Sequence, residues 1–139
     1  MGQQTDTAVS AIPLGLNRDH LRDIYYFLRL TREVENVLTN LYRQNKVIGG
    51  LYRSLRQEGT AVASAYALRR RNDGTGDVIA PAIRNLGGLF VMGAQPVDVM
   101  CQYMAKVDSP TQGREQNVHF TDYEHGFIGL ISHLGVMIE

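Results

Sequence analysis

The sequence has almost no cysteine, no net charge and no long apolar run, and each absence excludes a class of protein. Its single cysteine, Cys101, can form neither an internal disulfide nor a four-cysteine zinc site, so a reducing, cytoplasmic location is expected. The 14 basic and 14 acidic residues cancel, which removes the usual attraction to nucleic acid or to an anionic membrane. No stretch approaches the roughly 18 uninterrupted apolar residues of a membrane span. Neither nucleic acid nor membrane is therefore expected as a partner.

Familiar catalytic and nucleotide-binding motifs are also missing. The chain has no Gly-x-Gly-x-x-Gly, no phosphate-binding loop and no Gly-x-Ser-x-Gly. His119, Asp122, Glu124 and His125 could supply metal ligands, but their spacing matches no helical histidine pair, and solvated side chains are the favoured interpretation. Cys101 lies in an apolar helical pattern, which favours a buried, inert thiol over a nucleophile. We therefore expect no catalytic residue and no metal ligand within this chain.

What is present is the composition of one folded domain. The chain has 139 residues, of which 44% are hydrophobic and 20% are charged, as in an ordinary globular domain. Residues 1–17 are predicted to be a flexible leader, and residues 18–139 to belong to one domain. The chain closes on an apolar stretch, residues 135–139, without a cap or a polar tail. This ending favours the amino-terminal part of a longer protein.

A long helix is the clearest local pattern, because apolar residues recur every three or four positions from Leu21 to Tyr42. Asn17 or Asp19 is expected to cap its start, and Gly49-Gly50 to end it. The opposite face is expected to be solvated or to face a partner, and it holds Arg22, Arg29, Arg32, Glu33, Glu35, Arg43 and Lys46.

The remaining chain alternates helical and extended patterns. Gln57–Arg71 is lined with glycine, alanine and serine, which predicts a helix packed closely against another backbone. A turn then leads into a short buried strand, Val78–Ala80, which Pro81 ends. This order of helix, turn and strand is typical of an α/β protein. Two helices, a long loop and an extended segment are predicted to follow, at residues 83–92, 95–107, 108–126 and 127–131.

Four segments have the order and spacing of one known family: GLYRSLRQEGTA at Gly50–Ala61, DVIAPAIR at Asp77–Arg84, GREQNVHF at Gly113–Phe120 and ISHLG at Ile131–Gly135. The chain after about Leu21 resembles the amino-terminal part of the alpha subunit of thiamine-diphosphate-dependent 2-oxo acid dehydrogenases of the pyruvate and branched-chain type. The resemblance implies the helix-rich amino-terminal portion of an α/β thiamine-diphosphate-binding domain with a parallel sheet, incomplete within this chain.

The resemblance also implies which residues contact the cofactor. In the family a Tyr-Arg pair after the strand binds the diphosphate, and Arg84 matches that arginine. Ile83 stands in place of the tyrosine, and Leu86 stands where pyruvate-type enzymes have a histidine. Ser132 and Leu134 match the stretch that contacts the aminopyrimidine ring. The implied cofactor-binding residues are therefore Arg84, Ser132 and Leu134.

By the same resemblance, the complete enzyme decarboxylates a 2-oxo acid and passes the acyl group to a lipoyl acyltransferase. The family's Gly-Asp-Gly motif for magnesium does not occur in this sequence, so the metal ligands are expected outside the chain. The implied partners are a beta subunit, which supplies the catalytic glutamate, and a second alpha subunit. The isolated chain is therefore expected to be inactive. The alternative is a noncatalytic subunit-interaction module derived from this family.

Overall fold

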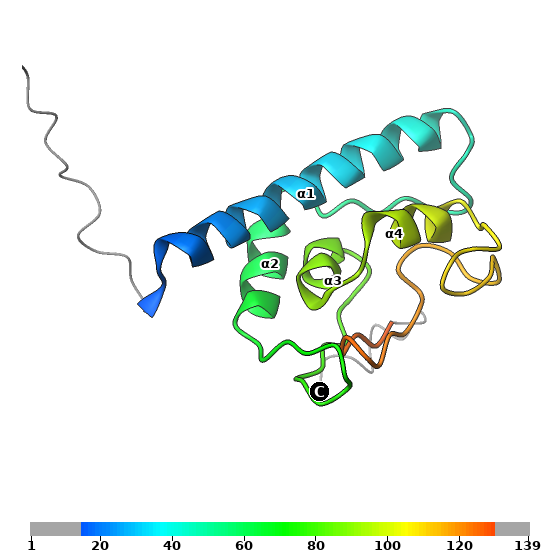
Figure 1. Ribbon diagram of the computed structural model, residues 1–139. Helices are drawn as coiled ribbons and strands as arrows, with labels where there is room; N and C mark the ends of the chain where they lie inside the picture. Colours follow the sequence, from blue (N-terminus) through cyan, green and yellow to red (C-terminus); the bar gives the residue numbers. More distant parts are fainter. Residues whose placement is uncertain (1–14, 130–139) are drawn as a thin grey trace, which may run out of the picture.

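The computed structural model describes residues 15–129, which form four helices and contain no strand. Helix α1 (Arg18–Arg43) is the long helix at the top of Figure 1. Below it in this view lie α2 (Glu58–Tyr66), α3 (Leu86–Met92) and α4 (Pro96–Tyr103). None of these helices combines the length and apolarity needed to cross a membrane. The helix-rich character expected from the sequence is confirmed for this part of the chain.

Asn17, rather than Asp19, caps the start of α1. The Asn17 side chain accepts a hydrogen bond of 2.8 Å from the backbone N–H of His20, and the His20 ring accepts one of 3.3 Å from the backbone N–H of Asn17. This reciprocal pair satisfies two N–H groups that a helix start leaves unpaired. The helix ends at Arg43, before the predicted Gly49-Gly50, because Asn45 adopts a positive φ of 57° that cannot continue it.

The core forms where the middle of α1 crosses the shorter helices. Helix α3 is buried along its whole length, and Gly87 lets it approach its neighbours closely. A Cβ at Gly87 would lie 3.0 Å from Val62 Cγ2, 3.2 Å from Thr31 Oγ1 and 3.3 Å from Ala61 Cβ. Ala61 of α2 therefore packs closely against the backbone of α3, as predicted for this helix, whereas Gly59, Ala63 and Ser64 are exposed. The most completely buried residues of the main core are Leu38, Leu89, Phe90, Val99, Tyr103 and Phe127.

Several predicted boundaries were wrong. The small-residue helix ends at Tyr66 rather than Arg71, and the next helix begins at Leu86 rather than Ile83, since the Asn85 side chain caps it. Helix α4 stops at Tyr103, short of the predicted Val107. Residues 108–126 contain no helix and no strand, which confirms the predicted long loop.

The predicted strand at residues 78–80 amounts to one isolated parallel bridge. Ile79 pairs with Phe127, through a 2.8 Å bond from Ile79 N–H to the carbonyl of Gly126 and a 2.9 Å bond from Ile128 N–H to the carbonyl of Ile79. Asp122 pairs with Phe127 in a second, antiparallel bridge. Two bridges are not a sheet, so the expected parallel sheet is not formed within the described residues. Most of the predicted leader, the apolar stretch at 135–139 and both Ser132 and Leu134 lie outside them.

Candidate functional site

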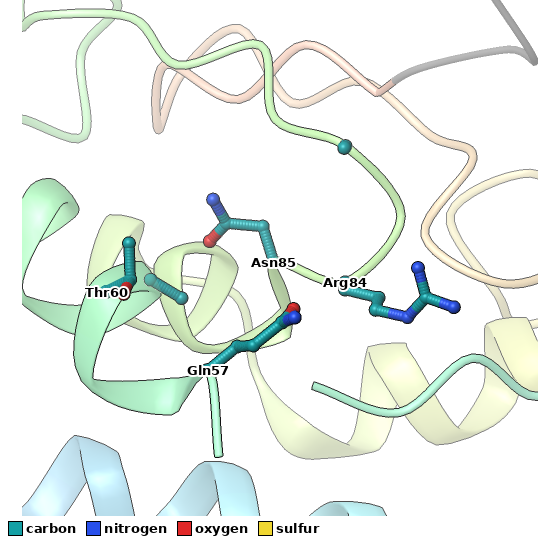
Figure 2. Close-up of a pocket in the computed structure, with 6 residues that line it drawn as sticks. Gln57, Thr60, Arg84 and Asn85 are labelled. Carbon is teal, nitrogen blue, oxygen red and sulfur yellow. The ribbon is translucent and has the colours of Figure 1, made fainter. Parts of the chain in front are cut away.

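Arg84 borders a pocket of about 380 Å³ between the start of α2 and the turn that precedes α3. Arg84 is the one charged side chain among the six lining residues, and the uncharged polar ones are Gln57, Thr60 and Asn85. Figure 2 shows the Gln57 side chain extending from the start of α2, and the Arg84 guanidinium pointing away from Thr60 and Asn85. Ala61 and Ala82 complete the lining, so the pocket has apolar as well as polar walls and one cation at its edge.

The turn before α3 explains why Arg84 is exposed. The Asn85 backbone N–H donates to the carbonyl of Ala82 at 3.1 Å, and the Asn85 side chain accepts from the N–H of Gly88 at 3.0 Å. These bonds fix a turn that leaves the Arg84 side chain in solvent. Its guanidinium carbon lies 5.9 Å from the centre of the Tyr52 ring, which is near the outer limit of a cation–π contact. Tyr52 is thus the aromatic neighbour of the candidate cofactor residue.

Ile83 and Leu86 do not line this pocket. Leu86 is 2% exposed and belongs to the main hydrophobic core, while Ile83 is partly buried and packs against the same core. An apolar side chain at either position gains more from core packing than from exposure beside an arginine. The position where the resemblance implies an active-site histidine is therefore a core position in this chain.

The pocket can accept an anionic group but shows no means of holding a metal. A guanidinium bonds phosphate oxygens with charge-assisted, often bidentate hydrogen bonds, and the neighbouring hydroxyl and amide groups can donate further ones. Across the described residues, no three His, Cys, Asp or Glu side chains cluster as a metal site would require. The pocket therefore fits a phosphate-bearing ligand at its Arg84 edge, with any metal held by other groups.

The histidines and carboxylates noted in the sequence do not converge on one point. His125 Nδ1 lies 2.7 Å from Asp122 Oδ2, whereas His119 Nδ1 lies 3.9 Å from Glu115 Oε2. The first pair stabilises the turn that leads into the Phe127 bridges, since the backbone N–H of His125 also donates to Asp122 Oδ1 at 3.1 Å. Cys101, predicted to be buried, is only half-buried on α4.

Glu35 is the main residue that the sequence analysis placed wrongly. It was assigned to a solvated or partner-facing surface of the long helix, but it is 2% exposed. Its Oε1 accepts hydrogen bonds from both the N–H and the hydroxyl of Ser54, which is itself buried. One signal was available: Glu35 follows Val34 and stands one helical turn from Thr31 and Leu38, three residues of the buried face.

Tyr103 belongs to a second buried hydrogen-bond network, next to the segment that follows α1. Its hydroxyl donates to Asn117 Oδ1 at 2.7 Å, and Asn117 Nδ2 donates to the carbonyl of Gly50 at 3.4 Å. Burial, and to a lesser extent the negative charge of Glu35, raises the pKa of Tyr103 above its ordinary value. These bonds tie α4 and the long loop to the segment that follows α1.

Comparison with known proteins gives a consistent family assignment. A sequence profile of the family described as "Dehydrogenase E1 component" matches residues 26–138. The probable pyruvate dehydrogenase E1 component subunit alpha, mitochondrial, of Caenorhabditis elegans is 26% identical over 114 residues, which cover 82% of this chain and 27% of that protein. The corresponding subunit of Chaetomium thermophilum is 24% identical over 84% of this chain and 26% of its own length. The type I subunit of Ascaris suum is 28% identical over 76% of this chain and 25% of its own. The chain spans about a quarter of the length of these relatives.

Proposed function

Because this chain belongs to the dehydrogenase E1 component family, we propose that it forms the amino-terminal region of the alpha subunit of a 2-oxo acid dehydrogenase. The observation that carries the proposal is the exposed Arg84 at the edge of a pocket, a few residues after the bridge at Ile79. In this role Arg84 binds the diphosphate of thiamine diphosphate. Ser132 and Leu134 are the proposed contacts of its aminopyrimidine ring.

The cofactor, when bound, supplies the carbanion chemistry that lets a 2-oxo acid lose carbon dioxide. The contribution of this chain is to bind and orient the cofactor. Arg84 binds its negatively charged diphosphate, and Gln57, Thr60 and Asn85 offer uncharged hydrogen-bonding groups around the pocket. Magnesium is proposed to be held by residues outside this chain. The proposed activity is therefore a property of the assembly, and the isolated chain is proposed to be inactive.

The proposed assembly contains a beta subunit, a second alpha subunit and the lipoyl acyltransferase that accepts the acyl group. Residues 18–139 are proposed to form one domain region, preceded by a leader. The Ile79–Phe127 bridge is proposed as the first contact of the parallel sheet of the complete domain. The single cysteine favours a reducing compartment, and we propose the cytoplasm.

The test is replacement of Arg84 by alanine in the assembled enzyme. Losing a charge-assisted hydrogen bond should raise the dissociation constant of thiamine diphosphate by roughly 10- to 150-fold, or about 1.5 to 3 kcal/mol, as measured by calorimetric titration with magnesium present. Arg69→Ala is the matched control, because the Arg69 side chain lies in an exposed ion pair with Asp77, at 3.4 Å, and its loss should change affinity less than about twofold. Equal affinity in both variants and the parent would remove the cofactor role of Arg84.

A noncatalytic subunit-interaction module is the second candidate, and two observations favour it. Leu86 is buried in the core, and the Arg84 guanidinium points away from Thr60 and Asn85 (Figure 2). If this candidate is right, Arg84→Ala should leave cofactor affinity unchanged while the chain still associates with its partner subunit, which co-purification can measure.

A further inference from the structure

Glu35 is a buried carboxylate that the proposed cofactor contacts do not use. It projects from α1 toward the segment between α1 and α2, and its side chain is 3% exposed. Burying a carboxylate is costly unless hydrogen bonds and an opposite charge compensate for the lost water. The groups that lie against the Glu35 carboxylate therefore show which part of the chain this side chain anchors.

Those groups belong to two consecutive residues, Arg53 and Ser54. Ser54 donates its backbone N–H at 2.7 Å, and its hydroxyl also, to Glu35 Oε1. Arg53 places its Nε 3.6 Å from Glu35 Oε2, and its terminal nitrogen donates to Asn36 Oδ1 at 2.9 Å. Adjacent residues of α1 thus bind adjacent residues of the segment, which fixes both its position and its direction.

Ser54 lies between two residues of this segment that approach Arg84 or its pocket, Tyr52 and Gln57. Toward the carboxyl end, the N–H of Gln57 donates to the carbonyl of Ser54 at 2.7 Å, and Gln57 then starts α2 and lines the pocket. Toward the amino end, Tyr52 places its ring beside the Arg84 guanidinium. Tyr52 and Gln57 lie within three positions of Ser54, so the position of Ser54 bears on both, while the start of α2 gives Gln57 a further support.

We propose that Glu35 is the positioning residue of the Arg84 pocket: by anchoring Ser54 it holds Tyr52 and Gln57 in place around the Arg84 side chain. Glu35 does not touch the ligand, and it acts through the segment that it anchors. A preorganised guanidinium loses less freedom when it binds an anion, so the anchor favours binding. The inference rests on the proposed function, because the pocket matters for catalysis only if Arg84 binds the cofactor.

The first experiment needs no cofactor and uses the 139-residue chain. Nuclear magnetic resonance of the Arg84 Nε–H and the Tyr52 ring reports their mutual position, and Tyr52→Leu identifies the shift that the ring causes. Glu35→Leu, which removes the anchor, should move the Arg84 signal toward its position in Tyr52→Leu. Glu35→Gln keeps an oxygen that can accept from Ser54 and should stay near the parent. Glu33→Gln, on the exposed side of α1, is the control and should cause no change.

The second experiment measures thiamine diphosphate affinity in the assembled enzyme. Glu35→Leu should weaken binding by roughly 2- to 10-fold, the expected effect of freeing one or two ordered side chains, with Glu35→Gln close to the parent. If Glu35→Leu does not fold, Ser54→Ala removes one of the two donors and should produce a smaller displacement of the same signals.

The outcomes separate the two proposals. Unmoved Arg84 and Tyr52 signals in folded Glu35→Leu or Ser54→Ala overturn the positioning role, even if Arg84→Ala weakens cofactor binding and so supports the proposed function. Displaced signals support the positioning role, and if Arg84→Ala then leaves affinity unchanged, it is the proposed function that fails.

Discussion

At the scale of single residues, two glycines on neighbouring helices have opposite surroundings. Gly59 on α2 is exposed, and a Cβ added there would meet nothing within 4 Å. Gly87 on α3 is buried, and its added Cβ would press on Val62, Thr31 and Ala61. The first glycine costs helix stability without any packing benefit, whereas the second permits the contact between α2 and α3.

We therefore expect Gly59→Ala to stabilise the fold by up to about 1 kcal/mol, because alanine loses less backbone entropy in a helix. Gly87→Val should destabilise it by about 1 to 3 kcal/mol, because overpacking forces the neighbouring helices apart. Urea unfolding followed by circular dichroism measures both. A Gly87→Val variant as stable as the parent would show that α2 and α3 are not in close contact.

Tyr103 provides a prediction at alkaline pH. Burial and the nearby Glu35 charge raise its pKa from the ordinary value of 10.0, so the unfolded chain releases this proton before the folded one does. The folded state then binds more protons than the unfolded state, and its stability falls as the pH rises past 10.0. Tyr103→Phe should remove this part of the decline.

At neutral pH the same variant should cost about 0.5 to 1.5 kcal/mol, because the hydrogen bond to Asn117 is lost. The free energies of unfolding of Tyr103→Phe and the parent, measured at neutral pH and at about pH 11, separate the lost hydrogen bond from the pH-dependent decline. A decline of equal steepness in Tyr103→Phe and the parent would assign the pH dependence to other tyrosines.

At the scale of elements, an ion pair joins α1 to the first turn of α2. Arg32 Nε lies 2.6 Å from Glu58 Oε1, and the Glu58 side chain is 7% exposed. Burial by itself would raise the pKa of Glu58, but the hydrogen bond from Arg32 and backbone N–H groups outweigh it, so the pKa lies below the ordinary 4.5. A carboxylate in the first turn also interacts favourably with the helix dipole. The pair thus sets where α2 begins relative to α1.

A lowered pKa makes the contribution of Glu58 pH-dependent. The stabilisation is present above pH 4.5 and is lost as the pH falls through the lower pKa of the folded state. Glu58→Gln should therefore reduce stability at neutral pH and flatten its loss in acid, measured as urea midpoints between about pH 6 and pH 3. Glu33→Gln, whose partner Arg29 is exposed, should change both quantities less.

At the scale of the whole molecule, the described chain is organised around the middle of α1. The buried residues of that helix are confined to its central turns, Thr31 to Leu38. Its first turns make fewer buried contacts: the Tyr66 hydroxyl donates to Asp23 at 3.1 Å, the Tyr66 ring meets His20 edge-on, and Ile24 packs against the cluster around Val62. The long helix of Figure 1 therefore combines a core segment with a more exposed start.

This division predicts how α1 exchanges its amide hydrogens. Amides of residues 31–38 should exchange only through opening of the core, while those of residues 18–26 should exchange faster, since fewer buried contacts oppose local fraying. Hydrogen exchange followed by mass spectrometry resolves the two parts. Equal protection along α1 would indicate that its first turns are covered by another surface, as in an assembly with a partner subunit.

Sequence patterns predict the features that depend on neighbouring residues along the chain. Periodic apolar residues predicted α1, Asn17 was one of two predicted caps, and the small residues of α2 predicted its close packing. These signals are local, because helix periodicity and capping involve residues within a turn or two of each other. The order of four motifs also led to the family that the profile match then showed.

Other features depend on contacts between distant segments. Glu35 is buried where Ser54 donates to its carboxylate and Arg53 lies 3.6 Å from it, both from another part of the chain. Leu86 belongs to the core because α1 and α4 also pack there. The strand predicted at Ile79 is a single bridge within the described residues, since pairing requires a second segment that local propensity cannot supply. Burial and pairing are properties of contacts between segments, so the pattern within any one segment does not contain them.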